Sequence, residues 1–383
     1  MQIIPRMAQG QIESRLFDKK AIIIYGARQT GKTTLAKRII EKYGEKAQYF
    51  DCELLSVRQN IEIPEADRLR SYLGKYKIVV LDEMQKIPSA GIILKILVDH
   101  CPEIQVIATG SSSFELANKT SEPMTGRAVR FTLYPFSVAE MEQKFNRFEI
   151  DAKLENIMRF GSYPEVFLAG SEERARERLN EVISNYLYKD ILAFEGIKKS
   201  AIIENLLKLL ALQLGNEVSY NELAQNLGIS RLTTQKYIDI LEQSFIIFTL
   251  KSFNRNLRKE ISKSVKIYFY DLGARNSLIQ NFNMLSLRND AGALWENLMI
   301  AERIKSNSHR QARPNRYFWR TYDRKEIDYI EESGGKLNAF EFKLSGKAKI
   351  PAEFLRSYSN SEFMTIAKNN YFNFIAENSR LPQ

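Results

Sequence analysis

The chain has 383 residues, of which 44% are hydrophobic and 27% are charged, and its formal net charge is +10. This length predicts two or three domains, and the composition is typical of globular proteins rather than of disordered or collagen-like chains. No apolar run approaches the ~20 residues that cross a bilayer, and the first residues lack a signal-segment pattern. We therefore expect a cytoplasmic protein with no membrane partner.

The positive charge favours polyanionic partners such as nucleic acid, although it also aids solubility. The two cysteines, Cys52 and Cys101, have no paired spacing. Neither a disulfide framework nor a thiolate zinc site is therefore expected.

The first motif is GARQTGKT at residues 26–33, which follows the apolar run AIIIY and precedes TLAKRIIEKY. A buried strand, a glycine-containing loop and a helix start are the context of a phosphate-binding loop. In such a loop Lys32 reaches the β and γ phosphates of a nucleotide, and the Thr33 hydroxyl binds Mg²⁺. The alternative is a turn with a solvated lysine. The candidate nucleotide-binding residues are Gly26, Ala27, Arg28, Gln29, Thr30, Gly31, Lys32, Thr33 and Thr34.

Two further apolar runs end in polar residues. KIVVLDEMQ at 77–85 is typical of a Walker B strand, in which Asp82 holds Mg²⁺ and Glu83 orients or deprotonates the attacking water. IQVIATGSSSF at 104–114 resembles a sensor strand, whose Thr109 and Ser111 would touch the γ phosphate. The alternative for these hydroxyls is a helix N-cap or a turn.

Arg127, in MTGRAVRFTL, is a candidate arginine finger, supplied within the chain or by a neighbouring subunit of a homo-oligomer. A surface or salt-bridge role is the alternative. Arg130 is close enough in sequence to compete for the same role.

Residues 150–210 are predicted to be helical, and residues 219–250 resemble a helix-turn-helix in which Gly228 makes the turn and Ser230 caps the second helix. The following apolar and basic segments extend this pattern to a winged helix. Its basic residues would meet DNA phosphates, or the element would dock a protein or act as a lid. The basic residues are Arg231, Lys236, Arg255, Arg258 and Lys259.

The last part of the chain contains the helix 293–304 and two predicted strands on either side of Gly334-Gly335. If these glycines form a two-residue hairpin turn, Asp328 lies opposite Glu341. Two opposed carboxylates repel each other, so a divalent cation between them is one prediction. The alternative is that Lys343 neutralises the pair and nothing binds.

Asp328, twelve residues, then Glu341-x-Lys343, preceded by a helix that bears Glu296, resembles the restriction-endonuclease-like PD-(D/E)XK fold. In that resemblance Glu296, Asp328 and Glu341 are a second metal site and Lys343 is the nuclease-type lysine. The whole chain resembles prokaryotic AAA+ family ATPases with such a C-terminal domain, which implies ATP and Mg²⁺ as cofactors. It departs from the family at Lys325, where a glycine is common, and at Ser162, where Gly-Gly-Tyr-Pro-Glu is common.

The predicted fold is α/β, with a parallel-sheet P-loop ATPase core at 1–148, a helical lid or connector at 149–212, a winged helix at 213–272 and an α/β nuclease-like domain at 273–383. Three functions remain open. They are an ATP-driven DNA-processing enzyme with an active nuclease, an ATP-dependent switch whose nuclease-like domain only binds, and a DNA-binding regulator whose assembly ATP controls.

Overall fold

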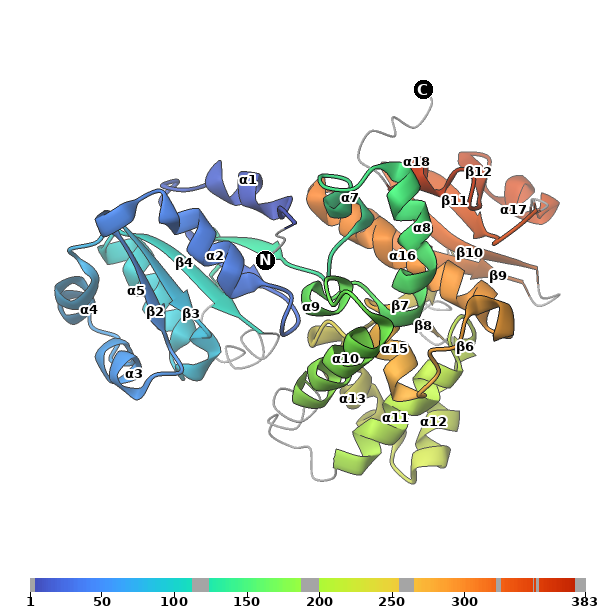
Figure 1. The fold of residues 1–383 in the computed structure, drawn as a ribbon, viewed down its shortest axis with the longest axis horizontal. Coiled ribbons are helices and arrows are strands. Elements are labelled where there is room, and N and C mark those ends of the chain that lie inside the picture. Colours follow the sequence, from blue (N-terminus) through green and yellow to red (C-terminus); the bar gives the residue numbers. More distant parts are fainter. Residues whose placement is uncertain are drawn as a thin grey trace. The chain divides into compact units, whose positions relative to one another are not determined.

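The computed structural model describes residues 4–111, 124–186, 200–254, 265–321, 325–346, 348 and 351–375 (Figure 1). The chain forms two compact units. Of the described residues, the first unit contains 4–111, 124–135, 185–186 and 243–245, and the second contains the others.

The first unit is built on a parallel sheet of five strands in the order β2-β3-β4-β1-β5. The strands are β1 (Ala21–Tyr25), β2 (Ala47–Asp51), β3 (Ile78–Asp82), β4 (Gln105–Gly110) and β5 (Ala128–Thr132). Every residue of β1, β3 and β4 is buried, as expected for continuous apolar runs in a parallel sheet that is covered on both faces.

Helices cover both faces of this sheet. On one face, Ala21, Ile23 and Tyr25 of β1 join the core formed with α3, α4 and α5. On the other face, Ile22 and Ile24 pack with α1 and α2. The alternation follows from the two-residue period of a strand. The helices are α1 (Ala8–Glu13), α2 (Lys32–Glu41), α3 (Leu55–Ile61), α4 (Ala66–Leu73) and α5 (Ala90–His100), with short 3₁₀ turns η1 (Gly44–Lys46) and η2 (Met84–Lys86).

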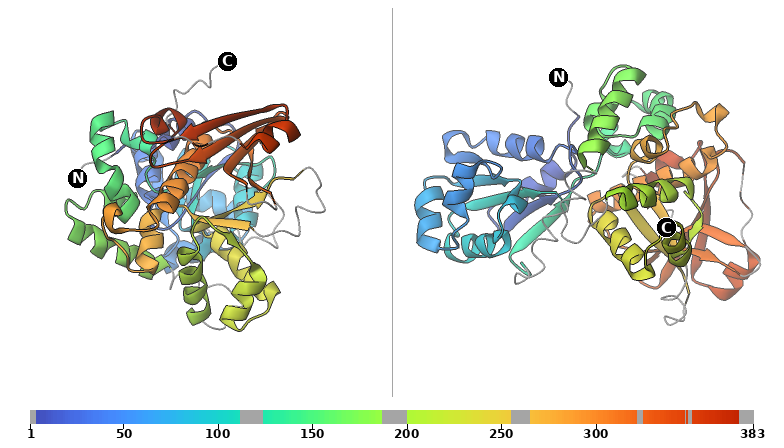
Figure 2. Two further views of the ribbon diagram at one scale, coloured as in Figure 1. Left: turned by 90° about the vertical axis from the view of Figure 1, so that its right-hand side faces the viewer. Right: turned by 90° about the horizontal axis from the view of Figure 1, so that it is seen from below.

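The second unit begins with helices and continues into a mixed sheet (Figures 1 and 2). Its helices are α7 (Val138–Met141), α8 (Arg147–Phe160), α9 (Pro164–Phe167), α10 (Glu172–Tyr186), α11 (Ser200–Leu212), α12 (Tyr220–Leu227), α13 (Arg231–Gln243), α15 (Leu272–Leu278), α16 (Ala291–His309), α17 (Ala352–Ser357) and α18 (Tyr371–Ile375), with the 3₁₀ turn η4 (Leu285–Leu287).

The sheet of the second unit has seven strands in the order β12-β11-β10-β9-β7-β8-β6. They are β6 (Glu217–Val218), β7 (Ile247–Ser252), β8 (Val265–Phe269), β9 (Asn315–Arg320), β10 (Glu326–Ser333), β11 (Lys336–Phe342) and β12 (Ser361–Ile366). Because β7 pairs with β9, the strands of segments 213–272 and 273–383 belong to one continuous sheet.

The hairpin between β10 and β11 has the predicted register. Ser333 pairs with Lys336 and Tyr329 with Phe340, around a turn at Gly334 and Gly335 in which both φ angles are positive. Counting one residue further from Tyr329 places Asp328 opposite Glu341.

None of the helices in the described part of the chain is long and apolar enough to cross a membrane.

Candidate nucleotide site and carboxylate cluster

The loop of residues 26–31 connects the end of β1 to the start of α2, at the carboxyl edge of the parallel sheet. Gly26 has φ 147°, and a Cβ at this position would lie 2.1 Å from the carbonyl oxygen of Leu133. Gly31 has φ 91°, immediately before the first helical residue. These two positions therefore require glycine for backbone reasons.

Lys32 is the first residue of α2, and its side chain is buried inside the loop. Its Nζ donates hydrogen bonds to the carbonyl oxygens of Gly26 at 2.9 Å and Ala27 at 2.8 Å. The Thr30 hydroxyl also donates to the oxygen of Ala27, at 2.9 Å. The loop is thus already closed around an ammonium group. Of the other predicted loop residues, Arg28 is half-buried, and Gln29 and Thr34 are exposed.

Asp82, the last residue of β3, accepts hydrogen bonds from three hydroxyl groups. Thr33 Oγ1 donates to Oδ2 at 2.8 Å, and the Tyr49 hydroxyl donates to the same oxygen at 2.5 Å. Thr109 Oγ1 donates to Oδ1. The donors come from α2, β2 and β4, so four neighbouring elements converge on one carboxylate beside the loop.

Glu83 follows directly and has a left-handed backbone conformation, with φ 53° and ψ 42°. This conformation is uncommon for a residue with a side chain, and it turns the chain sharply after the strand. The Glu83 N–H donates to Thr109 Oγ1 at 3.2 Å, and the Gln85 amide donates to the Glu83 carboxylate and to Ser111 Oγ, the latter at 3.1 Å. Burial raises the pKa of the Glu83 carboxyl, against the opposing effects of Lys32, Gln85 and Arg28.

The fold thus brings together the predicted Lys32, Thr33, Asp82, Glu83, Thr109 and Ser111. It also adds residues that the sequence did not single out. Besides Tyr49 and Gln85, Arg6 lies at this edge, and its guanidinium donates to the carbonyl oxygens of Thr30 at 2.8 Å and Tyr134 at 2.6 Å. Neither Arg6 nor Tyr49 belongs to a spacing motif, so only the three-dimensional fold shows their place.

Arg127 lies at the opposite edge of the sheet. The next residue, Ala128, pairs with Ala21 at the amino end of β1, whereas the loop follows the carboxyl end of that strand. The guanidinium Nε of Arg127 lies 2.8 Å from Asp99 Oδ1. A finger acting on phosphates of the same chain is at odds with this placement, and the salt-bridge alternative fits it. Action on a neighbouring subunit stays a prediction.

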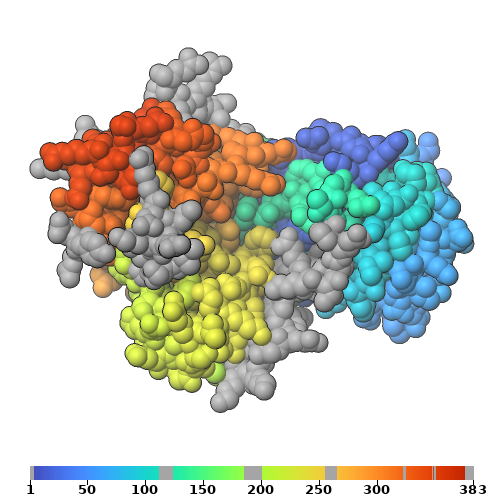
Figure 3. Space-filling model, turned by 180° about the vertical axis from the view of Figure 1, so that it is seen from behind, coloured from blue at the N-terminus to red at the C-terminus, as the bar shows by residue number. Residues whose placement is uncertain are grey.

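Helices α12 and α13 are joined by a turn at residues 228–230, and both lie at the surface of the second unit (Figure 3). Gly228 has φ 64°, and Ser230 Oγ accepts a hydrogen bond from the N–H of Thr233 at 3.1 Å, as an N-cap does. Arg231 and Lys236 are exposed on α13. The other predicted basic residues, Arg255, Arg258 and Lys259, lie outside the described part of the chain.

In the second unit, Glu296 of α16 lies near Asp328 of β10 and Glu341 of β11, as the resemblance implied. The Asp328 carboxylate accepts a hydrogen bond from the N–H of Phe342 at 2.9 Å. Lys343 Nζ lies 2.9 Å from Glu341 Oε1, which agrees with the alternative in which this lysine compensates the pair.

A second lysine, which the sequence did not single out, lies among these carboxylates. Lys266 of β8 is 1% exposed, and its Nζ lies 3.3 Å from Glu296 Oε1 and forms a second ion pair with Glu326. The Tyr268 hydroxyl donates to the same oxygen of Glu296 at 2.5 Å. We call Lys266, Glu296, Glu326, Asp328 and Glu341 the carboxylate cluster.

Burial and neighbouring charges shift the pKa values in this cluster. Burial, with Glu296 and Glu341, raises the pKa of Asp328 well above its usual range. Burial would lower the pKa of Lys266, but Glu296, Glu326 and Asp328 outweigh it and raise the pKa, so the amine stays protonated. Within the described ranges no group of three or more His, Cys, Asp or Glu side chains is arranged to hold a metal ion. Glu341 Oε2 is buried and has no hydrogen-bond partner. The divalent cation at this cluster stays a prediction.

The segment at 161–165, in which Ser162 stands where the family commonly has glycine, packs against Asp271. The Ser162 N–H donates to Asp271 Oδ2 at 2.7 Å, and a Cβ on Gly161 would lie 2.0 Å from Asp271 Oδ1. The Asp271 carboxylate also accepts from the N–H of Ala274 and so caps α15. Gly161 is required because this carboxylate is packed directly against its backbone.

Three family models match parts of the chain. Residues 18–142 match an AAA domain, residues 151–285 match a domain of unknown function (DUF8612), and residues 291–381 match another (DUF4143).

Relatives and solved structures that match longer stretches of the chain have low sequence identity to it. An uncharacterized protein of Mycobacterium tuberculosis is 27% identical over 355 residues, which cover 91% of this chain and 76% of that protein. An uncharacterized protein of Methanocaldococcus jannaschii is 26% identical over 312 residues, covering 76% and 68%. The RuvB Holliday junction branch migration motor of Thermotoga maritima has 16% identity and a TM-score of 0.30, covering 68% of this chain and 95% of that one. The Pif1 helicase of Candida albicans has 15% identity and a TM-score of 0.26, covering 47% and 48%.

With TM-scores this low, neither solved structure supports a statement about function. The AAA match, by contrast, spans the five-stranded parallel sheet, the loop and the acidic strand end described above. Residues 18–142 are therefore an AAA domain of the P-loop class.

Proposed function

We propose that the first unit binds ATP with Mg²⁺ and hydrolyses the nucleotide. The observation that supports this proposal is the meeting of Lys32, Thr33, Asp82 and Glu83 at the carboxyl edge of one parallel sheet. In open parallel sheets this edge is where ligands bind, and phosphoryl transfer needs positioned charge more than covalent chemistry.

Each residue has a task that its position permits. Lys32 would exchange its two loop carbonyls for the oxygens of the β and γ phosphates. The Thr33 hydroxyl and the Asp82 carboxylate, 2.8 Å apart, are a pair of oxygen donors of the kind that Mg²⁺ prefers. Magnesium, when bound, would neutralise phosphate charge there. Glu83, with its raised pKa, would orient the attacking water and accept its proton. Phosphate release by the purified chain, compared with Glu83→Gln, tests the proposal.

Tyr49 is expected to fix the Asp82 carboxylate for the metal. Its hydroxyl lies 2.5 Å from Asp82 Oδ2, and Lys37 Nζ lies 4.1 Å from the centre of its ring. We expect Tyr49→Phe to raise the Mg²⁺ concentration needed for half-maximal ATP binding by about 10-fold, because partners of a metal-binding carboxylate typically contribute that much. Binding of ATP in EDTA should not change. Tyr72→Phe is the control, since its ring packs against Phe50 and its hydroxyl is not part of the Asp82 network. An unchanged Mg²⁺ requirement in Tyr49→Phe would show that this hydroxyl has no role in metal binding.

We further propose that ATP controls a second unit which contacts DNA. The supporting observation is the order α12, turn, α13, then β7 antiparallel to β8, with Arg231 and Lys236 exposed on α13. This order resembles that of a winged helix, whose second helix would lie against nucleic acid. In this proposal 1–148 is the ATPase core, 149–212 the connector, 213–272 the winged helix and 273–383 a nuclease-like domain that does not cleave.

The double variant Arg231→Glu/Lys236→Glu should weaken binding to duplex DNA of any sequence. Two lost phosphate contacts should also reduce the slope of log affinity against log salt by about 2. The control is Arg174→Glu/Arg178→Glu on α10, where both side chains are exposed and the change in charge is the same. Fluorescence anisotropy at several salt concentrations measures both quantities. Equal losses in the two variants would mean that only the net charge of the chain attracts DNA.

A further inference from the structure

We infer that Lys266 is the built-in cation of the carboxylate cluster, and that its ammonium keeps divalent metal ions out of the nuclease-like part of the chain. This inference does not depend on ATP binding by the first unit. It concerns whether the second unit binds a divalent metal ion.

The position of the ammonium is the first observation. Lys266 lies on β8, between β6 and β7 in the sheet, and every residue of this strand is buried. Its Nζ forms ion pairs with Glu296, from α16, and with Glu326, from β10. A single group thus links three elements. Glu296 and Glu326 thus share one ammonium, and Glu326 is also paired with Arg320, at 3.8 Å.

The electrostatic interaction of the ammonium with the hairpin carboxylates is the second observation. Lys266 interacts electrostatically with Asp328 as well as with Glu296 and Glu326, so it faces the same space as the hairpin carboxylates. Lys343 compensates Glu341 from the other side, at 2.9 Å. Two lysines, together with Arg320 at Glu326, therefore compensate the four carboxylates of the cluster. A divalent ion at Asp328 would have to approach a buried ammonium, because Lys266 is 1% exposed.

The ammonium also shows that these carboxylates hold a cation in the folded protein. The hairpin register predicts a cation between Asp328 and Glu341, whereas the Lys266 ammonium pairs with the neighbouring Glu296 and Glu326 and is covalently part of the chain. Lysine carries one charge and donates hydrogen bonds, whereas a divalent ion takes six or more oxygen ligands. Replacing the lysine by an uncharged residue of similar length should therefore leave the carboxylates available to an external ion.

The test uses the full chain without nucleotide, and every protein in it carries Asp82→Asn so that the first unit contributes no Mn²⁺ site. Free Mn²⁺ is measured by electron paramagnetic resonance during a titration. In this background, the protein with native Lys266 should bind no Mn²⁺ that is lost when Asp328→Asn is added. Lys266→Met should gain one Mn²⁺ site, whose dissociation constant should be lower than that of any residual binding by on the order of 10-fold or more. Addition of Asp328→Asn should remove this site. Lys266→Arg keeps the charge and should gain no site.

Two results would overturn the inference. One is Mn²⁺ binding with native Lys266 that is lost on Asp328→Asn, because the ammonium would then not exclude the metal. The other is a folded Lys266→Met protein that binds no Mn²⁺. If Lys266→Met does not fold, Lys266→Met/Glu326→Gln replaces it, since this pair removes one charge of each sign and leaves Glu296, Asp328 and Glu341 in place. The same gain of one Mn²⁺ site is expected, and its absence would again contradict the inference.

Discussion

Lys32→Ala should weaken binding of ATP by at least about 100-fold, which corresponds to about 2.7 kcal/mol. The lysine ammonium is buried in the loop and donates hydrogen bonds to the carbonyl oxygens of Gly26 at 2.9 Å and Ala27 at 2.8 Å. Phosphate oxygens carry full negative charge and would replace these neutral acceptors, and truncating one partner of a buried charge pair is costly. Isothermal titration calorimetry with ATP and Mg²⁺ measures the effect.

The control for this variant is Arg38→Ala, which removes an exposed cation from the same helix. It should bind ATP as the parent does, apart from a small salt-dependent change. Parent-like ATP binding by Lys32→Ala would show that the loop at 26–33 does not hold phosphates in this chain.

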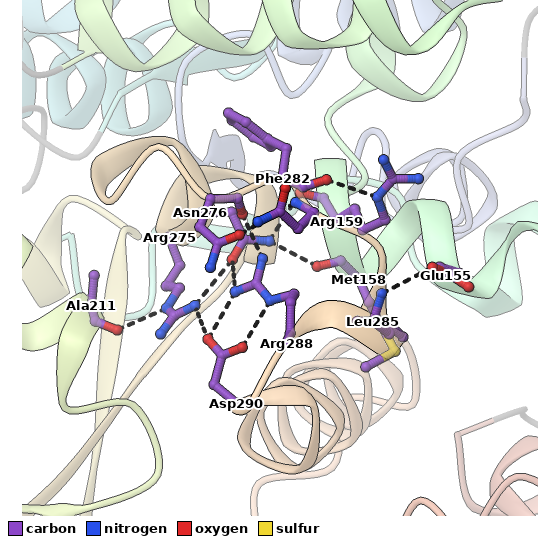
Figure 4. Close-up of polar contacts among 12 residues, drawn as sticks. Glu155, Met158, Arg159, Ala211, Arg275, Asn276, Phe282, Leu285, Arg288 and Asp290 are labelled. Carbon is purple, nitrogen blue, oxygen red and sulfur yellow. Dashed lines mark hydrogen bonds and ion pairs between the residues drawn. The ribbon is translucent and has the colours of Figure 1, made fainter.

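Asp290→Ala should destabilise the second unit by about 3 kcal/mol, because it leaves two buried guanidinium groups without their carboxylate. Asp290 accepts hydrogen bonds from Arg275 at 2.6 Å and from Arg288 at 2.8 Å (Figure 4). The two arginine side chains are 3% and 0% exposed. They also reach Ala211 of α11 and Asn276 of α15, so Asp290 holds the start of α16 to both helices.

Thermal unfolding followed by circular dichroism should show a lower midpoint for this unit, by roughly 6 to 12 °C. The control is Glu181→Ala, which breaks a pair with Arg178 whose side chains are about half exposed, and it should cost under about 1 kcal/mol. Equal midpoints for the two variants would mean that the Asp290 network adds no more than a surface ion pair.

The same carboxylate predicts a pH dependence. Burial raises the pKa of Asp290, but hydrogen bonds from Arg288 and Arg275 outweigh it and lower the pKa from 3.8 to about 2. The folded state is therefore favoured when the group is ionised. The ionised carboxylate contributes about 2 kcal/mol to the free energy of unfolding. This contribution is fully present above the pKa of the group in the unfolded chain, and it is lost as the pH falls through the pKa of the group in the folded chain. The difference in stability between the parent and Asp290→Ala should shrink from about pH 4 towards pH 2, and a constant difference over that range would contradict the assignment.

Features set by local chemistry could be predicted from the sequence. The phosphate loop is one, because glycine at 26 and 31 and the lysine that follows are needed within eight residues of chain. The hairpin register is another, because Gly334 and Gly335 fix a two-residue turn and the rest follows by counting.

Features set by distant pairing could not be predicted in this way. Tyr49 reaches Asp82 only because β2 lies beside β3 in the sheet, and Arg127 is remote from the loop only because β5 runs parallel to β1. No sequence motif singled out Lys266. Its role depends on β8 lying near α16 and on a seven-stranded sheet that joins two segments predicted as separate domains.

The most direct measurement of the proposed ATPase is steady-state phosphate release from ATP and Mg²⁺, by the parent chain and by Glu83→Gln, with and without duplex DNA. The parent should release phosphate, and Glu83→Gln should bind ATP with parent-like affinity but release phosphate at least about 100-fold more slowly, as expected when a general base is removed. Stimulation of the parent by DNA would connect the first unit to the second. Parent-like turnover by Glu83→Gln, or a parent that binds ATP and releases no phosphate under any of these conditions, would contradict the proposal that the edge formed by Lys32, Thr33, Asp82 and Glu83 is a hydrolytic site.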